Sequence, residues 1–352
     1  MDYFKSKTYV DELKNVIENL HGLHKIKESS ILVTGATGLI GSYIVDLFLV
    51  NNKFYESNVT IYAMGRSRDK LVSRFGETTD DRLHFVEQDV TQQMTLEFEV
   101  DYVIHAASNA YPARFNSDPV GTIMGNVQGV YQLLEYGRIH NIKRLLFVST
   151  GEVYGQGDNS IEAFAESYSG YTNPMEVRSC YPESKRMAEN LCVAYKKQYN
   201  QDCIVARLCH TYGPNVSKGD NRASVQFFSD AMNGKNVVLK SKGTKFRSYC
   251  YVADAVSGLL YVLLEGKSGE AYNVANPDIQ VSIAQLASAI AEQKGCKVIF
   301  DISESEMLEE TPIEKQILSC DKIIELGWKA NYSLEEGIVH TYSIWEEMNW
   351  HP

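Results

Sequence analysis

The sequence has no block of basic residues, no long apolar run and no cluster of cysteines. Its formal net charge is -11 over 352 residues, which argues against nucleic-acid binding because neutralising phosphates requires a basic face. The seven cysteines stand apart, without CxxC or Cys/His ligand spacing, so we expect reduced thiols and no metal site. The polar N-terminus, with no apolar run after it, predicts neither a signal peptide nor a membrane span, and hence a cytoplasmic protein without a membrane partner.

What the sequence does contain is the composition of a globular enzyme, with 44% hydrophobic and 22% charged residues. Residues 7–28 carry apolar residues at helical spacing, which predicts one amphipathic helix that packs ahead of the main fold as an appendage. From Ile31 onward strand-like and helix-like segments alternate, and repeated βα units predict an α/β fold with a Rossmann-type, doubly wound parallel sheet. The expected strands are residues 31–34, 59–64, 83–87, 102–107, 144–148 and 203–208.

Turn signals become denser where His210-Thr-Tyr-Gly-Pro begins a more irregular passage. We therefore expect three parts: an N-terminal helical extension at 1–28, a dinucleotide-binding Rossmann domain at 29–208, and a smaller C-terminal substrate-binding lobe at 209–352. Part of the last, near 271–294, is a candidate to return to the first domain.

Three glycines follow the first expected strand, in Gly35-Ala-Thr-Gly38-Leu-Ile-Gly41, and lead into a helix. Glycine there permits a tight turn, lets the backbone approach a pyrophosphate and lets the helix pack close to the strand, while the helix N-terminus attracts the anion. A tight turn without a ligand is the competing interpretation, but a place between strand and helix favours a dinucleotide site. The expected contacts are Gly35, Thr37, Gly38, Leu39, Ile40 and Gly41.

An arginine-rich turn ends the second expected strand. Arg66, Ser67 and Arg68 stand where NAD sites usually carry an acidic residue, and they would suit a 2′-phosphate. The sequence thus predicts NAD or NADP, with solvated loop charges as the alternative interpretation of the arginines. Asp89 and Val90 follow the third strand, where an adenine would lie.

Tyr181 and Lys185 stand four residues apart at the start of a helix-like run. On a helix both side chains lie on one face, so the ammonium can sit beside the phenol, lower its pKa and make it a proton acceptor near neutrality. The same spacing also arises by chance in a chain with 22 tyrosines. At the end of the fifth strand, Thr150 offers a hydroxyl to the reacting oxygen and Glu152 adds a carboxylate, although polar residues there also serve as turn formers.

Taken in order, these motifs resemble those of the extended branch of the short-chain dehydrogenase/reductase family, the nucleotide-sugar epimerases, dehydratases and decarboxylases. The resemblance covers nearly everything from Ile31 onward, and within it the sequence is most similar to UDP-glucuronate decarboxylases (UDP-xylose synthases). The motifs that carry it are Gly35xxGly38xxGly41, Asp89-Val90, His105-Ala-Ala-Ser108, Thr150 with Val153-Tyr-Gly155, Tyr181xxxLys185, Tyr212-Gly-Pro214 and Leu326-Gly-Trp328.

The resemblance implies a tightly bound NAD or NADP, a nucleotide-diphosphate sugar as substrate with UDP-sugars favoured, a homodimer, and a place in polysaccharide biosynthesis. It implies that Tyr181, activated by Lys185 and paired with Thr150, takes the proton of the sugar 4-hydroxyl as hydride leaves C4, giving a transient 4-ketone. If C6 is a carboxylate, the resulting β-keto acid loses carbon dioxide and Glu152 handles the proton at C5. The further contacts implied are Ala106, Ala107, Ser108 and Lys185 for the cofactor, and Ser108, Asn109, Arg178, His210, Arg222 and Arg247 for the substrate, the last two holding the diphosphate.

Three features depart from the decarboxylase pattern: Gly151 replaces a serine, His210 replaces an asparagine, and the arginine-rich turn replaces the NAD pattern. Gly151 also stands where 4,6-dehydratases have an aspartate acid, so that reaction is less favoured. A nucleotide-sugar 4-epimerase and an NADPH-dependent 4-keto-sugar reductase remain as alternatives. A non-catalytic dinucleotide sensor is the last alternative, and the intact Thr150, Tyr181 and Lys185 argue against it.

Overall fold

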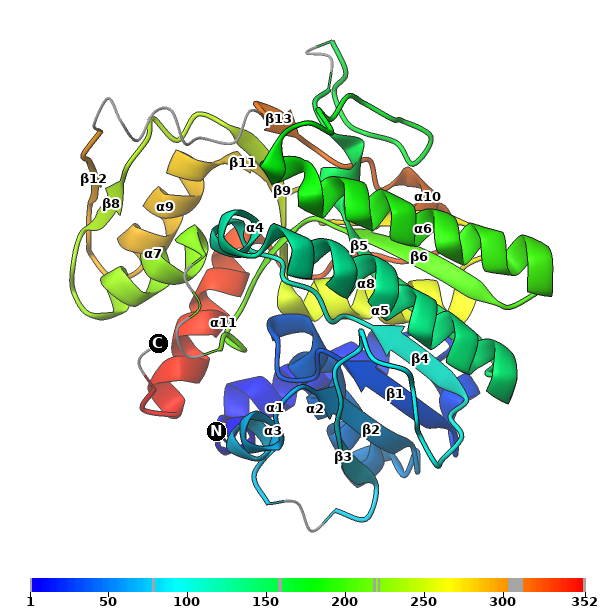
Figure 1. Ribbon diagram of the computed structural model, residues 1–352. Helices are drawn as coiled ribbons and strands as arrows, with labels where there is room; N and C mark the ends of the chain where they lie inside the picture. Colours follow the sequence, from blue (N-terminus) through cyan, green and yellow to red (C-terminus); the bar gives the residue numbers. More distant parts are fainter. Residues whose placement is uncertain are drawn as a thin grey trace.

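The computed structural model describes residues 2–77, 80–157, 160–217, 220, 222–302 and 313–350. Its centre is a seven-stranded sheet in the order β10-β6-β5-β4-β1-β2-β3, with every neighbouring pair parallel (Figure 1). Its strands are β1 Ser30–Thr34, β2 Thr60–Gly65, β3 Leu83–Glu87, β4 Tyr102–His105, β5 Arg144–Thr150, β6 Cys203–Leu208 and β10 Ala271–Val274. The strand order reverses between β1 and β4, at the point where ligands bind in doubly wound sheets. The predicted α/β class and parallel sheet are confirmed.

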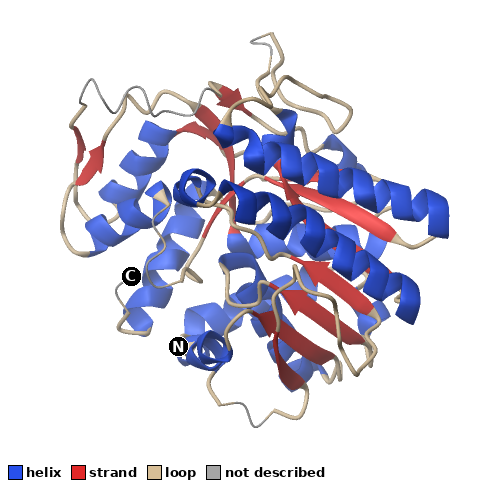
Figure 2. Ribbon diagram, in the orientation of Figure 1, coloured by secondary structure: helices blue, strands red, loops and turns tan. Residues whose placement is uncertain are grey.

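Helices cover both faces of this sheet (Figure 2), because successive residues of each strand point to opposite sides and both sides are apolar. On β1, Ile31 and Val33 belong to one buried cluster and Leu32 to another. The first cluster includes side chains of α1, α2 and α8, and the second includes side chains of α5 and α6. These helices are α1 Lys7–Asn19, α2 Leu39–Tyr55, α5 Pro119–His140, α6 Cys180–Tyr199 and α8 Val252–Glu265.

The N-terminal segment is built into the fold. Helix α1 packs against α2, α8 and α11 (Leu334–Glu347). The buried Tyr9 hydroxyl donates to Asp46 Oδ2 on α2 at 2.7 Å and accepts from Asn215 Nδ2 at 2.6 Å. The helix predicted over 7–28 ends at Asn19, and the chain turns at Gly22, whose left-handed φ of 81° cannot continue a right-handed helix. A 3-10 helix, η2 (Leu23–Ile26), completes the segment.

A second lobe follows β6. Helices α7 and α9 pack together beside the β8–β12 pair, on the left of Figure 1, while β9 pairs with β7, β11 and β13. Within this passage the chain returns to the first sheet, because β10 pairs with β6. The elements of the lobe are β7 His210–Tyr212, α7 Ala223–Met232, β8 Val237–Leu239, β9 Phe246–Tyr251, β11 Gln280–Ser282, α9 Ile283–Glu292, β12 Val298–Phe300 and β13 Lys315–Gln316. Helix α10 (Asp321–Glu325) packs instead against β10 of the first sheet.

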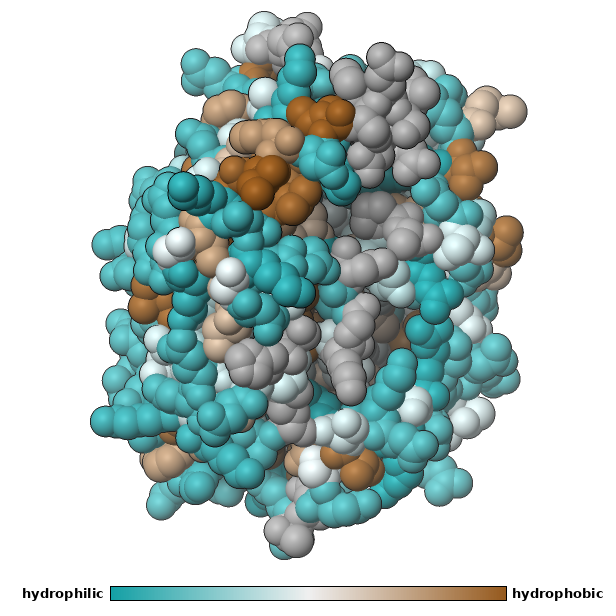
Figure 3. Space-filling view, turned by 90° about the vertical axis from the view of Figure 1, so that its left-hand side faces the viewer, coloured by the Kyte–Doolittle hydropathy of each residue, from teal (hydrophilic) through white to brown (hydrophobic). Residues whose placement is uncertain are grey.

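Two groups of exposed apolar side chains bear on possible contacts of this protein. Figure 3 looks onto the β8–β12 side, which is largely hydrophilic with a few apolar patches, and the exposed apolar side chains of those strands are Val238, Ile299 and Phe300. A larger set lies on α5 and α6, namely Val120, Ile123, Met124, Tyr131, Ile139, Met187, Val193 and Tyr199. Within the described ranges no helix has both the length and the apolar character that crossing a bilayer requires.

Candidate active site

The glycine turn between β1 and α2 brings backbone segments into very close contact. Gly35 has a left-handed φ of 67°, and a Cβ there would lie 2.8 Å from the backbone of Ala107. A Cβ on Gly41 would collide with the Gly35 carbonyl oxygen. Gly38 precedes α2 without a side-chain cap, so the first N–H groups of this helix stay free for an anion. The cradle therefore fits the pyrophosphate of a dinucleotide.

The ends of β1 and β4 meet beside this turn. Thr34 Oγ1 lies 2.7 Å from His105 Nδ1 and accepts from the Ala107 backbone N–H at 3.2 Å. These bonds fix the chain from Ala106 to Ser108 against the glycine turn. The structure thus brings together the predicted cofactor contacts on both segments. Thr37 lies in the glycine turn, and Leu39 and Ile40 begin α2.

At the end of β2 the predicted phosphate contacts differ in their surroundings. The Ser67 hydroxyl caps α3 (Arg68–Phe75) by accepting from the Lys70 N–H at 3.3 Å. The Arg68 guanidinium lies 6.0 Å from the Phe85 ring. Arg66 is exposed, and no hydrogen bond or ion pair joins it to another described residue. Arg66 is therefore the side chain here that is available to a ligand.

Asp89 and Val90 follow β3 at the same edge of the sheet. Asp89 Oδ1 accepts from both the backbone N–H and the hydroxyl of Thr91, at 2.9 and 2.8 Å. The Val90 side chain would be 3.0 Å from a Cβ on Gly129, so α5 approaches closely here. Both residues are half-buried, and Asp89 shapes the loop through its own hydrogen bonds.

Tyr181 lies at the start of α6 in a buried polar and aromatic setting. Thr150 at the end of β5 and Ser108 after β4 lie close enough to its hydroxyl to lower the pKa of the phenol. Its ring stacks on Phe115 with centroids 4.5 Å apart. Lys185, one turn further along α6, places Nζ 5.9 Å from the Tyr181 ring centroid and donates to the Val148 carbonyl at 2.9 Å. The helical spacing therefore brings the predicted catalytic residues together.

The pKa values of this pair differ from the expectation. Burial raises the pKa of Tyr181, and the charge of Glu152 raises it further, whereas Thr150, Arg178 and Ser108 lower it less. The prediction of a lowered phenol pKa is wrong for this arrangement, because desolvation disfavours the phenolate more than its neighbours stabilise it. Burial also lowers the pKa of Lys185 to about 7, against the charge of Glu189, which raises it. The amine can thus change charge near neutral pH.

Glu152 and Arg178 form an ion pair beside Tyr181. Arg178 Nη2 donates to both carboxylate oxygens, at 2.9 and 2.8 Å, and the guanidinium lies 4.6 Å from the Phe115 ring. Short 3-10 helices position both residues: η3 (Gly151–Tyr154), which follows Thr150 directly, and η4 (Val177–Ser179), which leads into α6. The predicted proton-handling carboxylate and the predicted substrate arginine are therefore partners in the structure.

The predicted diphosphate arginines already have partners within the protein. Arg222 pairs with Asp220, with Nη2 at 2.7 Å from Oδ2. Arg247 is buried and donates to the carbonyls of Phe246, Glu314 and Ile313, at 2.8, 3.1 and 2.6 Å. Burial lowers the pKa of Arg247. Holding a diphosphate would require both guanidinium groups to share or exchange these partners.

His210 lies near both arginines. Its ring is accessible to solvent, yet its pKa is lowered to about 3, first by the surrounding protein atoms and then by the charges of Arg247 and Arg222. Asn109 follows Ser108 and is half-buried.

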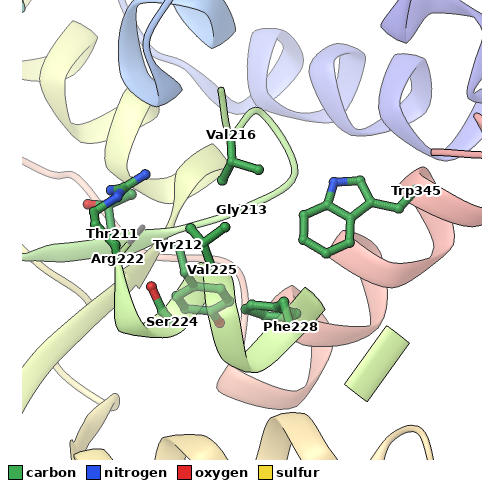
Figure 4. Close-up of a pocket in the computed structure, with 9 residues that line it drawn as sticks. All are labelled: Thr211, Tyr212, Gly213, Val216, Arg222, Ser224, Val225, Phe228 and Trp345. Carbon is green, nitrogen blue, oxygen red and sulfur yellow. The ribbon is translucent and has the colours of Figure 1, made fainter. Parts of the chain in front are cut away.

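A narrow crevice, too tight inside to hold a water molecule and open in part to solvent, lies in the second lobe (Figure 4). Arg222 and Thr211 stand at one end and the Trp345 indole at the other (Figure 4). None of Thr150, Tyr181 and Lys185 lines it, so it is separate from the catalytic group. The lining residues are Thr211, Tyr212, Gly213, Val216, Arg222, Ser224, Val225, Phe228 and Trp345.

The fold and this constellation define a dinucleotide-dependent enzyme class, and the chain belongs to the NAD dependent epimerase/dehydratase family, whose model matches residues 31–275. It is 36% identical over 312 residues to UDP-glucuronic acid decarboxylase 6 of Arabidopsis thaliana, covering 88% of this chain and 86% of that protein. UDP-glucuronic acid decarboxylase 1 of Xenopus tropicalis is 31% identical, and the match covers 88% of this chain and 70% of that protein. The predicted family resemblance is confirmed.

Solved structures share the fold. DesIV of Streptomyces venezuelae, a dTDP-glucose 4,6-dehydratase with NAD and TYD bound, superposes with a TM-score of 0.77 at 25% identity, covering 92% of this chain and 99% of that one. UDP-glucuronic acid 4-epimerase of Bacillus cereus superposes with a TM-score of 0.72 at 22% identity, covering 91% of this chain and 99% of that one. At this identity the likeness concerns the fold alone.

Two residues of the site were not predicted from the sequence. Phe115, on α4 (Pro112–Ser117), stacks on Tyr181, and Ser217 donates from the second lobe to the Thr37 carbonyl in the glycine turn at 3.2 Å. Phe115 follows shortly after the His105-Ala-Ala-Ser108 motif, and this nearness in the sequence was a usable signal. Nothing in the sequence around Ser217 indicates that it reaches the glycine turn.

Proposed function

We propose that the protein oxidises a nucleotide sugar at C4 to a transient 4-ketone, and that its substrate is UDP-glucuronate, which it decarboxylates. The observation that carries the proposal is one cluster of described residues: Tyr181 beside Thr150, Lys185 one turn away, and the Glu152–Arg178 pair beside them. The identity of over a third to a UDP-glucuronic acid decarboxylase supports the same substrate.

In this mechanism a nicotinamide dinucleotide, held by the glycine cradle, supplies the hydride acceptor when it is bound. Tyr181 exchanges a proton with the sugar 4-hydroxyl, while the Thr150 hydroxyl, which lies beside the phenol, orients the reacting oxygen. Lys185, with a pKa of about 7, holds or releases a proton on the same face of α6. Tyr181 and Lys185 are buried and Thr150 is half-buried, which limits the access of water to the proton transfer.

The carboxylate step uses the Glu152–Arg178 pair. A C6 carboxylate would compete with Glu152 for the Arg178 guanidinium, which releases Glu152 toward C5. In the β-keto acid the C5–C6 bond breaks, carbon dioxide leaves, and the bonding electrons pass into the 4-ketone as an enolate. A proton delivered to C5, by Glu152 or by a water that it orients, restores the ketone. Return of hydride to C4 and of a proton to its oxygen then gives the pentose product.

A second candidate is an NADPH-dependent 4-keto-sugar reductase, which exposed Arg66 favours. A residue that reads a 2′-phosphate suits a cofactor that exchanges with the medium, whereas decarboxylation and 4-epimerisation run on a tightly bound dinucleotide without net consumption. We propose that the cofactor is NADP if Arg66 contacts a 2′-phosphate on the ribose, and NAD if it does not. Mass spectrometry of the denatured protein as purified identifies the dinucleotide directly.

We propose that the protein is a homodimer in which α5 and α6 of each subunit form a four-helix bundle. The exposed apolar side chains of α5 and α6 support this arrangement, since α5 and α6 pack side by side (Figure 1). Light scattering on the purified protein gives the oligomeric state. The seven free thiols support a reducing, cytoplasmic setting.

We also propose a division of labour along the chain. Residues 29–208 would hold the dinucleotide and 209–352 mainly the nucleotide sugar, with β10 contributing to the first part and residues 1–28 joining both. The Ser217 bond to Thr37 and the Tyr9 bond to Asn215 support a close connection between these parts.

The experiment that tests the function is a panel of nucleotide sugars. With UDP-glucuronate we expect release of carbon dioxide and a UDP-pentose, measured by mass spectrometry, without consumption of added dinucleotide. An isomer of unchanged mass seen by NMR would assign 4-epimerisation instead, and consumption of NADPH with a 4-keto sugar would assign reduction. Either result without carbon dioxide overturns the decarboxylase proposal.

A further inference from the structure

A buried carboxamide with an unpaired N–H lies beside Gly151, the residue that follows Thr150. Gln316 is 4% exposed, and its side-chain nitrogen is buried and donates to no other described residue. An unpaired buried N–H destabilises the folded state, and groups of this kind in folded proteins call for an explanation. An oxygen of the substrate would be the missing acceptor.

The neighbours of Gln316 place it in the site. β13 pairs with β9, with Gln316 opposite Arg247. A Cβ built on Gly151 would lie 3.6 Å from the Gln316 carboxamide carbon and 3.1 Å from Leu318 Cδ2. Since Gly151 has no side chain, Gln316 and Leu318 fill the space that a side chain at position 151 would enter.

Position 151 lies between the two residues that mark the reacting part of the sugar. Thr150 lies beside the Tyr181 hydroxyl and so marks the 4-hydroxyl, whereas Glu152, two residues further along the chain, carries the carboxylate proposed for C5. The substituent on C5 of a pyranose is C6, so a group beside position 151 faces the C6 side. Gln316 supplies a neutral donor there, and Arg178 supplies a charge.

We propose that Gln316 determines specificity for the C6 group by donating its amide N–H to a carboxylate oxygen of the sugar. The inference rests on the proposed function and adds to it the residue that selects uronic acids over neutral hexoses. A neutral donor stabilises a bound carboxylate without an additional ion pair, because Arg178 provides the balancing charge.

The test compares UDP-glucuronate with UDP-glucose, which differ only at C6. Gln316→Glu keeps the shape but sets a carboxylate against the C6 carboxylate, so we expect the affinity for UDP-glucuronate to fall on the order of 100-fold. A C6 hydroxyl can donate to the new carboxylate, and binding of UDP-glucose should therefore be retained. Gln316→Leu removes the donor, and we expect a loss for UDP-glucuronate of about 10- to 100-fold. Both affinities are measured by calorimetry, with kcat/KM for carbon dioxide release beside them.

The outcomes separate the two proposals. If the wild-type protein releases no carbon dioxide from UDP-glucuronate, the proposed function fails and the inference fails with it. If the wild-type protein decarboxylates but both variants keep its ratio of affinities, only the inference is overturned. An equal loss for both sugars, with a lowered thermal midpoint, would assign Gln316 a packing role and overturn it as well. Gln316→Leu serves as the decisive variant if Gln316→Glu does not fold.

Discussion

Replacing Lys185 by methionine should stabilise the protein without dinucleotide while abolishing turnover. Lys185 is 2% exposed, and burial lowers its pKa to about 7 from the 10.5 of a free lysine. At a pH between these two values, Lys185 is charged in the unfolded chain and neutral in the folded protein, so folding releases its proton. At lower pH the amine stays charged on folding, and its desolvation costs free energy. Methionine has a similar length and no charge to desolvate, so the variant should fold more favourably.

The magnitude follows from the two pKa values. At pH 6 to 7 Lys185 is protonated in the unfolded chain, and burying it lowers the free energy of unfolding by about 4–5 kcal/mol. At pH 9 the folded lysine is neutral and the unfolded one still charged, which leaves about 2 kcal/mol, and above the unfolded pKa the cost disappears. Losing the hydrogen bond to the Val148 carbonyl opposes this by about 1 kcal/mol. We expect a net gain of roughly 3 kcal/mol at pH 7 that declines as the pH rises.

The assay is urea unfolding of dinucleotide-free protein at pH 6, 7, 8 and 9, followed by tryptophan fluorescence. Wild-type stability should rise with pH relative to the Lys185→Met variant. Lys197, near the end of the same helix, is exposed and provides the matched control, because Lys197→Met should show no such pH-dependent difference. A Lys185→Met variant that is less stable than wild type at every pH, or one whose advantage does not change with pH, would refute the reasoning.

Three further substitutions test separate parts of the site. Tyr181→Phe should lower turnover about 10²- to 10⁴-fold with an unchanged far-UV spectrum, because the ring still stacks on Phe115; retained turnover would remove the phenol from the mechanism. Arg66→Ala should weaken NADP binding about 10- to 100-fold by titration, through loss of a charge-assisted bond, and leave NAD binding almost unchanged; an equal effect on both dinucleotides would contradict a 2′-phosphate contact. Tyr9→Phe should cost about 1–3 kcal/mol of unfolding free energy, because its buried hydroxyl serves two partners, and a loss below about 0.5 kcal/mol would show that the network is not needed.

Local patterns were sufficient for much of the architecture. The turn at Gly35 needs a left-handed residue, and the four-residue spacing of Tyr181 and Lys185 fixes one helix face, so both were predictable within a few residues. The raised phenol pKa was not, because it depends on how much protein surrounds the ring once α4 and α6 pack. Ion pairs such as Glu152 with Arg178 could not be predicted from local patterns either, because residues far apart in the chain become neighbours only when the chain folds.

The substrate side shows the same limit more clearly. The sequence marks Arg222 and Arg247 as cations, but it does not indicate that Asp220 and three backbone carbonyls take up their donors. Gln316 carries no motif and becomes notable only because β13 places it beside Gly151. Long-range register, rather than composition, decides these contacts.

The position of β10 in the sheet affects how the protein chain folds while the ribosome synthesises it. Residues 209–270 separate β6 from β10, its neighbour in the sheet, so the outer edge of β6 stays unpaired while the ribosome makes β7, β8, β9 and α8. At about 5–20 residues per second this interval lasts roughly 3–12 s. An open strand edge is a template for wrong pairing, and the nascent chain must protect it during those seconds, until Ala271 emerges.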